Sequence, residues 1–159
     1  WFFVGMVNYF LTCLQCAFQV TLTFQKIIHF TDWVVGHAHL VMFGVFGSWI
    51  FGMIQYLWPK VTGREWYSRR ECEWTFWLMA VGVSIMFLSL VAAGLVQGFL
   101  WRDLAPFETS ITASTPFWFA RVFAGLLIVA GAITLAHNMW RTAHGDRAVQ
   151  ATPQPAGVV

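Results

Sequence analysis

The sequence predicts an all-α protein, a polytopic bundle of four transmembrane helices. First, 58% of the 159 residues are hydrophobic and only 10% are charged, whereas a soluble domain is roughly one-quarter charged. Second, four stretches with few or no charges each exceed the roughly 20 residues that a helix needs to cross the hydrocarbon core. Third, if all four stretches span the membrane, the basic residues of the connecting segments lie mostly on one side of it.

The first span covers about residues 1–24 and contains no Lys, Arg, Asp or Glu. Polar residues recur in it at spacings of four, three and four, which places them on one helix face; they are Asn8, Thr12, Gln15 and Gln19. Because unpaired polar groups are costly in hydrocarbon, this face should be turned toward a helix bundle or a hydrated cavity. It is a candidate route for water or protons, and hydrogen bonding between helices is the alternative. We expect Cys13 and Cys16 to be ordinary buried thiols.

The second span, about residues 33–58, contains two histidines with one alanine between them, His37 and His39. We expect Asp32 to be the N-cap of this helix. Residues i and i+2 of an α-helix point roughly 200° apart, so the two side chains cannot bind one ion together. Histidine is the usual axial ligand of haem iron, and a helix between two haems would hold both close enough for electron transfer. The alternative is that these are packed, hydrogen-bonded histidines.

The third and fourth spans cover about residues 74–101 and 115–140, and Arg121 is the only formal charge inside any span. A charge at this depth needs a partner, unless its long side chain reaches the membrane surface. The segment 59–73 and the C-terminal tail contain six basic residues, whereas the segments 25–32 and 102–114 contain two. Basic residues are enriched in cytoplasmic loops, so we expect loop 59–73 and the C-terminus to be cytoplasmic.

The chain divides into a membrane region, residues 1–142, and a tail, residues 143–159, whose Pro and Ala content predicts disorder. Because the first span begins at residue 1 without a basic leader, we expect the chain to be the C-terminal part of a longer protein. The net charge of +2 is modest, and topology and contact with anionic lipid explain the basic loop. We therefore expect membrane lipid, and no nucleic acid, among its partners.

Four segments of the sequence, in this order and with this spacing, resemble the cbb3-type catalytic subunit I of the haem-copper oxidases. They are TDWVVGHAHLVMFG at 31–44, GREWYS at 63–68, the run from FWLMAVGV to AAGLVQGFLWR at 76–102, and FARVFAGLLIVAGA at 119–132. The resemblance extends from about Trp1 to Thr142 and corresponds to the last four helices of that twelve-helix fold. It implies that helices missing from this sequence complete the subunit.

The resemblance also implies a role for each histidine of the pair. His37 would ligate a high-spin b-type haem where oxygen is reduced, and His39 a low-spin b-type haem that passes electrons to it. The copper ligands of the family lie on earlier helices, so we expect this segment to be inactive alone. His29 and Arg121 would lie near the haem propionates, with an exposed loop histidine and a surface-reaching arginine as alternatives. Gln15 occupies the position of a glutamate that the family usually has near the high-spin haem.

The resemblance implies a terminal oxidase in a bacterial inner membrane. It would take electrons from cytochrome c through c-type haem subunits, reduce oxygen to water and couple this reaction to proton translocation. A nitric oxide reductase of the same superfamily, with iron in place of copper, is the alternative, and the uncharged Gln15 favours it. Two further hypotheses are a haem-free membrane protein whose histidines relay protons and an inert structural fragment.

Overall fold

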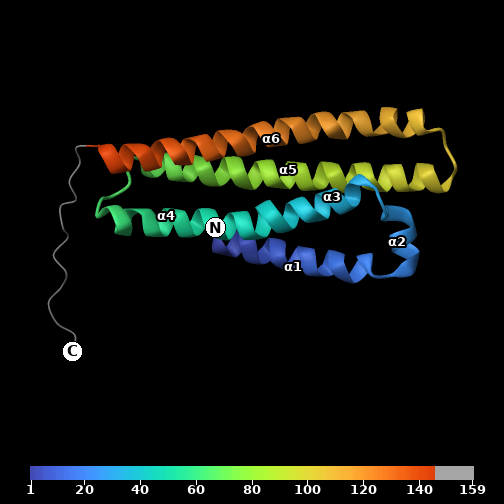
Figure 1. Cartoon of the computed structure of the whole chain (residues 1–159), viewed down its shortest axis with the longest axis horizontal. Helices are drawn as coiled ribbons and strands as arrows, with labels where there is room; N and C mark the ends of the chain where they lie inside the picture. Colours follow the sequence, from blue (N-terminus) through green and yellow to red (C-terminus); the bar gives the residue numbers. More distant parts are fainter. Residues whose placement is uncertain (146–159) are drawn as a thin grey trace.

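The computed structural model describes residues 1–145, and these form helices and short connections (Figure 1). The elements in chain order are α1 (Phe2–Gln19), α2 (Leu22–Ile28), α3 (Asp32–His39), the π-helix η1 (Leu40–Gly47), α4 (Ser48–Thr62), α5 (Arg69–Arg102) and α6 (Phe107–His144). In the described part of the chain, four helical stretches are long and apolar enough to cross a membrane: α1, the continuous run Asp32–Thr62, α5 and α6. The predicted all-α fold class is confirmed.

The four long stretches lie side by side along one axis, and the short α2 crosses one end of the bundle (Figure 1). The helices α5 and α6 pack against each other along their length, and α3 packs against α5. This second contact is close because Gly94 has no side chain, and an added Cβ there would collide with the backbone of Trp33. Small residues permit such approach between membrane helices.

The structure differs from the expectations at the end of α1 and at the start of α3. The helix α1 ends at Gln19, before the expected end at residue 24, and the hydroxyl of Thr21 donates to the carbonyl of Phe18 at the turn that follows. The N-cap of α3 is Thr31, whose Oγ1 accepts a hydrogen bond from Trp33 N at 3.3 Å. The expectation that Asp32 is the cap was wrong, because the Asp32 carboxylate is bound by two other helices instead.

At the other end, α6 continues through His144, so the first residues of the predicted tail are helical. The rest of the predicted disordered tail, residues 146–159, lies outside the described residues. The α4–α5 connection is tied to α6 by Asn138, a fully buried residue whose side chain bonds both the N–H and the carbonyl of Ser68. The guanidinium of Arg64 donates to the carbonyl of Ala143 in the last turn of α6.

A π-helix follows His39 directly. The segment η1 is eight residues long, although helices with i→i+5 bonds are rare, mostly single-turn, and frequent at functional sites. The side chain of Asn8 in α1 donates to the carbonyl of Gly44 inside η1 at 2.9 Å. The unusual segment is therefore held by the polar face of α1.

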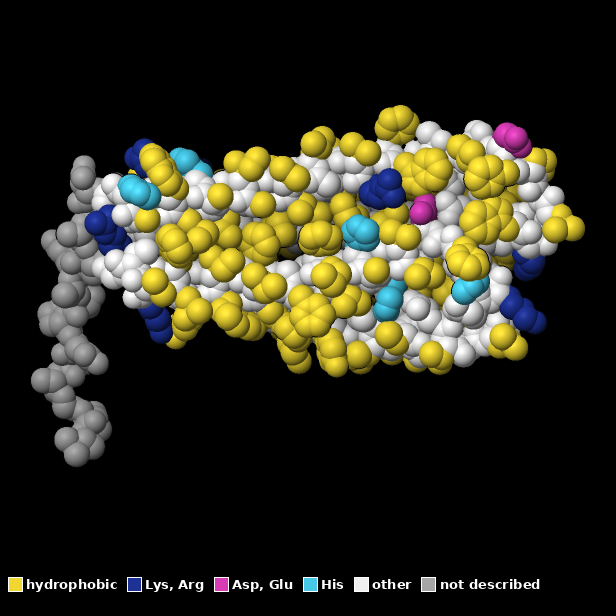
Figure 2. Space-filling view, viewed as in Figure 1, with side chains coloured by type: hydrophobic (Ala, Val, Ile, Leu, Met, Phe, Trp, Pro, Cys, Tyr) yellow, Lys and Arg dark blue, Asp and Glu magenta, His cyan; other side chains and the backbone are white. Residues whose placement is uncertain are grey.

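Hydrophobic side chains cover most of the visible face of the molecule, and Lys and Arg side chains lie mainly near its ends (Figure 2). Large exposed side chains such as Phe3, Phe10, Phe119 and Leu126 are more than half exposed. In a membrane protein such a surface faces lipid tails or other membrane helices. The distribution fits a bundle embedded along most of its length.

Candidate cofactor-binding site

The imidazole of His37 lies between α3 and α1. Its Nδ1 is 3.1 Å from Oε1 of Gln15, and its ring is parallel to the buried ring of Trp33, with 6.2 Å between centroids and 6° between planes. Because an amide oxygen can only accept, Nδ1 of His37 donates this bond and the ring's lone pair lies on Nε2. Sγ of Cys16 lies 3.7 Å from this Nε2, and its S–H donates a weak hydrogen bond to the lone pair.

The imidazole of His39 has a different set of neighbours. Its Nδ1 donates to the carbonyl of Val35 one turn earlier, at 2.8 Å, and its ring lies 5.7 Å from that of Phe43. This bond again leaves the lone pair on Nε2. His144 makes the same kind of contact with the carbonyl of Trp140 at 3.0 Å, so the bond alone does not distinguish a ligand. What distinguishes His39 is its place within an apolar, membrane-length helix.

This donor set fits a haem better than a bare metal ion. In residues 1–145 no group of three or more His, Cys, Asp or Glu side chains could hold a metal ion. A haem brings the in-plane ligands of its iron and needs only an axial side chain from the protein. Histidine ligands typically donate one ring N–H to a carbonyl or carboxylate and bind metal through the other nitrogen. Both His37 and His39 meet this requirement.

The polar face of α1 contacts α3 and η1. The continuous helix that contains His37 and His39 is called the histidine helix below. Asn8 bonds η1, and Gln15 bonds His37 in α3. Oγ1 of Thr12 and Nε2 of Gln19 are buried and have no hydrogen-bond partner among the described residues. Buried polar atoms without a protein partner are typically satisfied by ordered water. We therefore expect ordered water at Thr12 and at Gln19.

The two residues expected near haem propionates, His29 and Arg121, were also located in the structure. His29 is exposed at the end of α2, and its Nδ1 accepts from Nε2 of Gln25 at 2.9 Å, so its Nε2 is the protonated nitrogen. Arg121 is half-buried on α6 and forms no hydrogen bond or ion pair within residues 1–145. Neither residue makes a hydrogen bond or ring contact to His37 or His39 in that part of the chain.

Two features of the site were missed from the sequence. Cys13 and Cys16 are exposed rather than buried, and Cys16 lies beside His37. Gln97 in α5 is 6% exposed and binds Asp32 at the start of α3. A polar residue in a charge-free span, one helical turn after Gly94, is a signal that could have identified Gln97.

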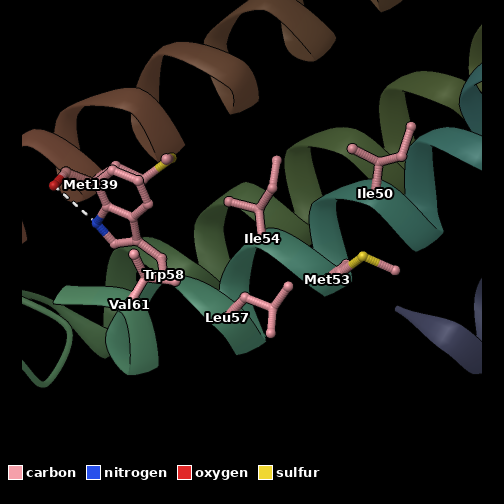
Figure 3. Close-up of a pocket in the computed structure, with 7 residues that line it drawn as sticks. All are labelled: Ile50, Met53, Ile54, Leu57, Trp58, Val61 and Met139. Carbon is pink, nitrogen blue, oxygen red and sulfur yellow. Dashed lines mark hydrogen bonds between the residues drawn. The ribbon is translucent and has the colours of Figure 1, made fainter. Parts of the chain in front are cut away.

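An apolar groove of about 330 Å³ lies elsewhere, between α4 and α6 (Figure 3). Its walls include Leu57, Trp58 and Met139, and the indole N–H of Trp58 is bound to the carbonyl of Met139 at 3.2 Å. No titratable side chain lines it. The groove is therefore separate from the candidate site and offers no chemistry of its own.

Comparison with known proteins gives one family. Residues 1–127 match the family described as cytochrome c and quinol oxidase polypeptide I.

The cytochrome c oxidase subunit 1 homolog of Agrobacterium tumefaciens is 33% identical over 131 residues, which cover 77% of this chain and 24% of that protein. The cbb3-type cytochrome c oxidase subunit CcoN1 of Stutzerimonas stutzeri is 30% identical over 147 residues, 87% of this chain and 31% of that protein. A nitric oxide reductase subunit of the same species is 30% identical over 119 residues, 69% of this chain and 25% of that protein. The chain spans about a quarter to a third of the length of these relatives.

Proposed function

This chain belongs to the cytochrome c and quinol oxidase polypeptide I family, and we propose that it forms a haem-ligating part of the catalytic subunit of a respiratory terminal oxidase. The complete enzyme would take electrons from cytochrome c, reduce oxygen to water and translocate protons. The observation that supports this proposal is the histidine pair. Nδ1 of each imidazole donates to an oxygen, so the lone pair of each lies on Nε2; in His37 that Nε2 contacts the thiol of Cys16.

His37 would hold a high-spin b-type haem, and His39 would hold a low-spin b-type haem. Bound haems would supply electron transfer and the site of oxygen chemistry. The chain's own part is to hold the two imidazoles. Gln15 fixes the ring of His37 from α1, and the carbonyl of Val35 fixes the ring of His39 from within α3. Since copper ligands are proposed on helices outside this segment, the active site needs the rest of the subunit.

The polar face of α1 would conduct protons toward this site through water molecules bound by Thr12 and Gln19. Both residues offer a buried polar atom without a partner in residues 1–145. The competing explanation is that the face only joins helices, as Asn8 does in its bond to η1. The half-buried guanidinium of Arg121 has no partner within residues 1–145; it is a candidate partner for a haem propionate, because an arginine within a membrane span needs a partner and a carboxylate can bind it. His29 is a second, exposed candidate.

In this proposal the protein lies in a bacterial inner membrane, with loop 59–73 and the C-terminus cytoplasmic, and functions with c-type haem subunits. A second candidate function is nitric oxide reduction with a non-haem iron in place of copper. It is favoured by the neutral Gln15 and by the similarity to a nitric oxide reductase. Purified complete enzyme distinguishes the two: copper content with oxygen consumption supports the oxidase, and non-haem iron with nitric oxide consumption supports the reductase.

The ligand assignment is tested by optical and EPR spectra of the complete subunit. We expect His37→Ala to remove the high-spin signal and His39→Ala to remove the low-spin signal. His144→Ala is the matched control, because His144 makes the same contact to a carbonyl one turn earlier but lies at the end of α6. Both haem signals surviving in both ligand variants would overturn the assignment.

A further inference from the structure

The carboxylate of Asp32, at the start of the histidine helix, is bound by two other helices. Nε2 of Gln97 in α5 donates to its Oδ2 at 2.9 Å, and Nε1 of Trp118 in α6 donates to the same oxygen at 2.6 Å. The backbone N–H of Asp32 donates back to Oε1 of Gln97 at 2.8 Å. Asp32 and Gln97 therefore form a closed pair of hydrogen bonds, and Trp118 adds a third.

The amide of Gln97 has no spare hydrogen-bonding capacity on its nitrogen. Its Nε2 also donates to Oγ of Ser114 at 3.0 Å, so both amide hydrogens are used. Gln97 is 6% exposed and Ser114 is fully buried. Inside a protein, a fully satisfied polar network is rigid, and loss of one partner leaves a costly unpaired group. This network therefore has one strongly favoured geometry.

Trp33 connects this hydrogen-bond network to His37. Trp33 follows Asp32 directly, is 4% exposed, and has its backbone against Gly94 of α5. Its ring is parallel to that of His37. A rotation of the first turn of α3 would therefore move the Trp33 ring that stacks on His37. The same rotation would turn His39, which lies in the same helix.

We propose that Asp32, Gln97 and Trp118 are positioning residues that set the rotation of the histidine helix, and thereby the directions of the two imidazoles. The inference rests on the proposed haem ligation by His37 and His39. None of the three residues bonds to an imidazole, so their effect is through α3. Helices built to hold ligands depend on such supporting contacts, because small displacements degrade a site.

The chain offers a matched pair of substitutions. Trp118→Phe removes one indole N–H and with it one of the bonds that hold α3. Trp101→Phe also removes one indole N–H, whose bond runs from α5 to Oγ of Ser110 in α6 at 3.0 Å and does not touch α3. Both changes keep an aromatic ring at the same end of the bundle. A general loss of stability would affect the two variants alike, whereas a change in helix rotation is expected only in the first.

A second pair separates geometry from charge. Both donors bind Oδ2 of Asp32, so Asp32→Asn can retain both bonds with its amide oxygen in that place. Asp32→Leu removes them and is expected to change the haem signals, and Gln97→Leu is expected to do the same. Asp32→Asn should keep the EPR g-values of the parent protein.

The readouts are EPR g-values and midpoint potentials of both haems in the complete subunit. We expect shifts in both quantities for Trp118→Phe and larger shifts for Gln97→Leu, with no shift for Trp101→Phe. Unchanged g-values and potentials in Trp118→Phe, or equal shifts in both tryptophan variants, would overturn the inference even if Gln97→Leu fails to fold. Absence of haem from the parent protein would instead overturn the proposed function itself.

Discussion

The Oε1 atom of Gln15 lies 3.1 Å from Nδ1 of His37, so an uncharged side chain of α1 accepts a hydrogen bond from the imidazole N–H. The strength of this acceptor affects how strongly Nε2 donates to a bound metal. A carboxylate would attract the Nδ1 proton more strongly than the amide does. A substitution at Gln15 in α1 can therefore alter how strongly His37 binds a metal.

We expect Gln15→Glu in the complete subunit to lower the midpoint potential of the haem bound to His37, because a more basic imidazole stabilises the oxidised iron. If the polar face of α1 conducts protons, the dependence of turnover on pH should change as well. Redox titration and turnover measured against pH check both expectations. Gln15→Leu is the control that removes the bond without adding an acid. An unchanged pH–rate profile beside a lowered melting temperature would contradict the proton route and support a purely structural role.

Loop 59–73 is expected on the cytoplasmic side. Single cysteines at Glu65 and Thr112, introduced after the three native cysteines are replaced, test this. Both positions are exposed and lie at opposite ends of the bundle. A membrane-impermeant thiol reagent added from the periplasmic side should modify only the Thr112→Cys variant. Modification of the Glu65→Cys variant under the same conditions would invert the orientation.

Gly94→Ala is expected to destabilise the protein by about 1–3 kcal/mol, the usual cost of overpacking. The added Cβ would collide with the backbone of Trp33, which cannot move as a side-chain end could. Gly125→Ala is the control, because the nearest atom to a Cβ there is Cε of Met86 at 3.9 Å. Apparent melting temperatures in one detergent should fall for the first variant and stay level or rise for the second. Equal melting temperatures would show that α3 and α5 do not pack this closely.

Asn138→Leu should also lower stability, by about 1–3 kcal/mol for each buried group left unpaired. The side chain of Asn138 satisfies the N–H and the carbonyl of Ser68, and both bonds would be lost. His137→Gln, next to it, removes a half-exposed imidazole that pairs with Glu71 and contacts the ring of Tyr67, and it should cost at most about 1 kcal/mol. Thermal unfolding of the two variants compares these values. A smaller loss for Asn138→Leu than for His137→Gln would be inconsistent with the observed packing.

The sequence predicted the number of spans because apolar length alone determines which segments can cross a membrane. Helical periodicity also placed Gln15 on the polar face of α1 with Asn8, two residues that bond the next span, whereas haem ligation by His37 and His39 stays a prediction. It did not predict the contacts of Gln97 with Asp32, whose positions lie 65 residues apart along the chain. These bonds displaced Asp32 from the N-cap role that local sequence favours. The end of α1 at Gln19 and the exposure of Cys16 likewise depend on how helices meet rather than on local composition.

The π-helix η1 affects where the continuous helix Asp32–Thr62 can lose a residue during evolution. A stretch of i→i+5 bonds holds more residues per turn than an α-helix. Deleting one residue within η1 (Leu40–Gly47) can therefore be absorbed by a return to α-helical bonding, with α3 and α4 keeping their present faces. The same deletion in the middle of α5 would rotate everything beyond it by roughly 100°. Single-residue deletions among related sequences should accordingly be tolerated immediately after His39 and excluded from the interior of α5.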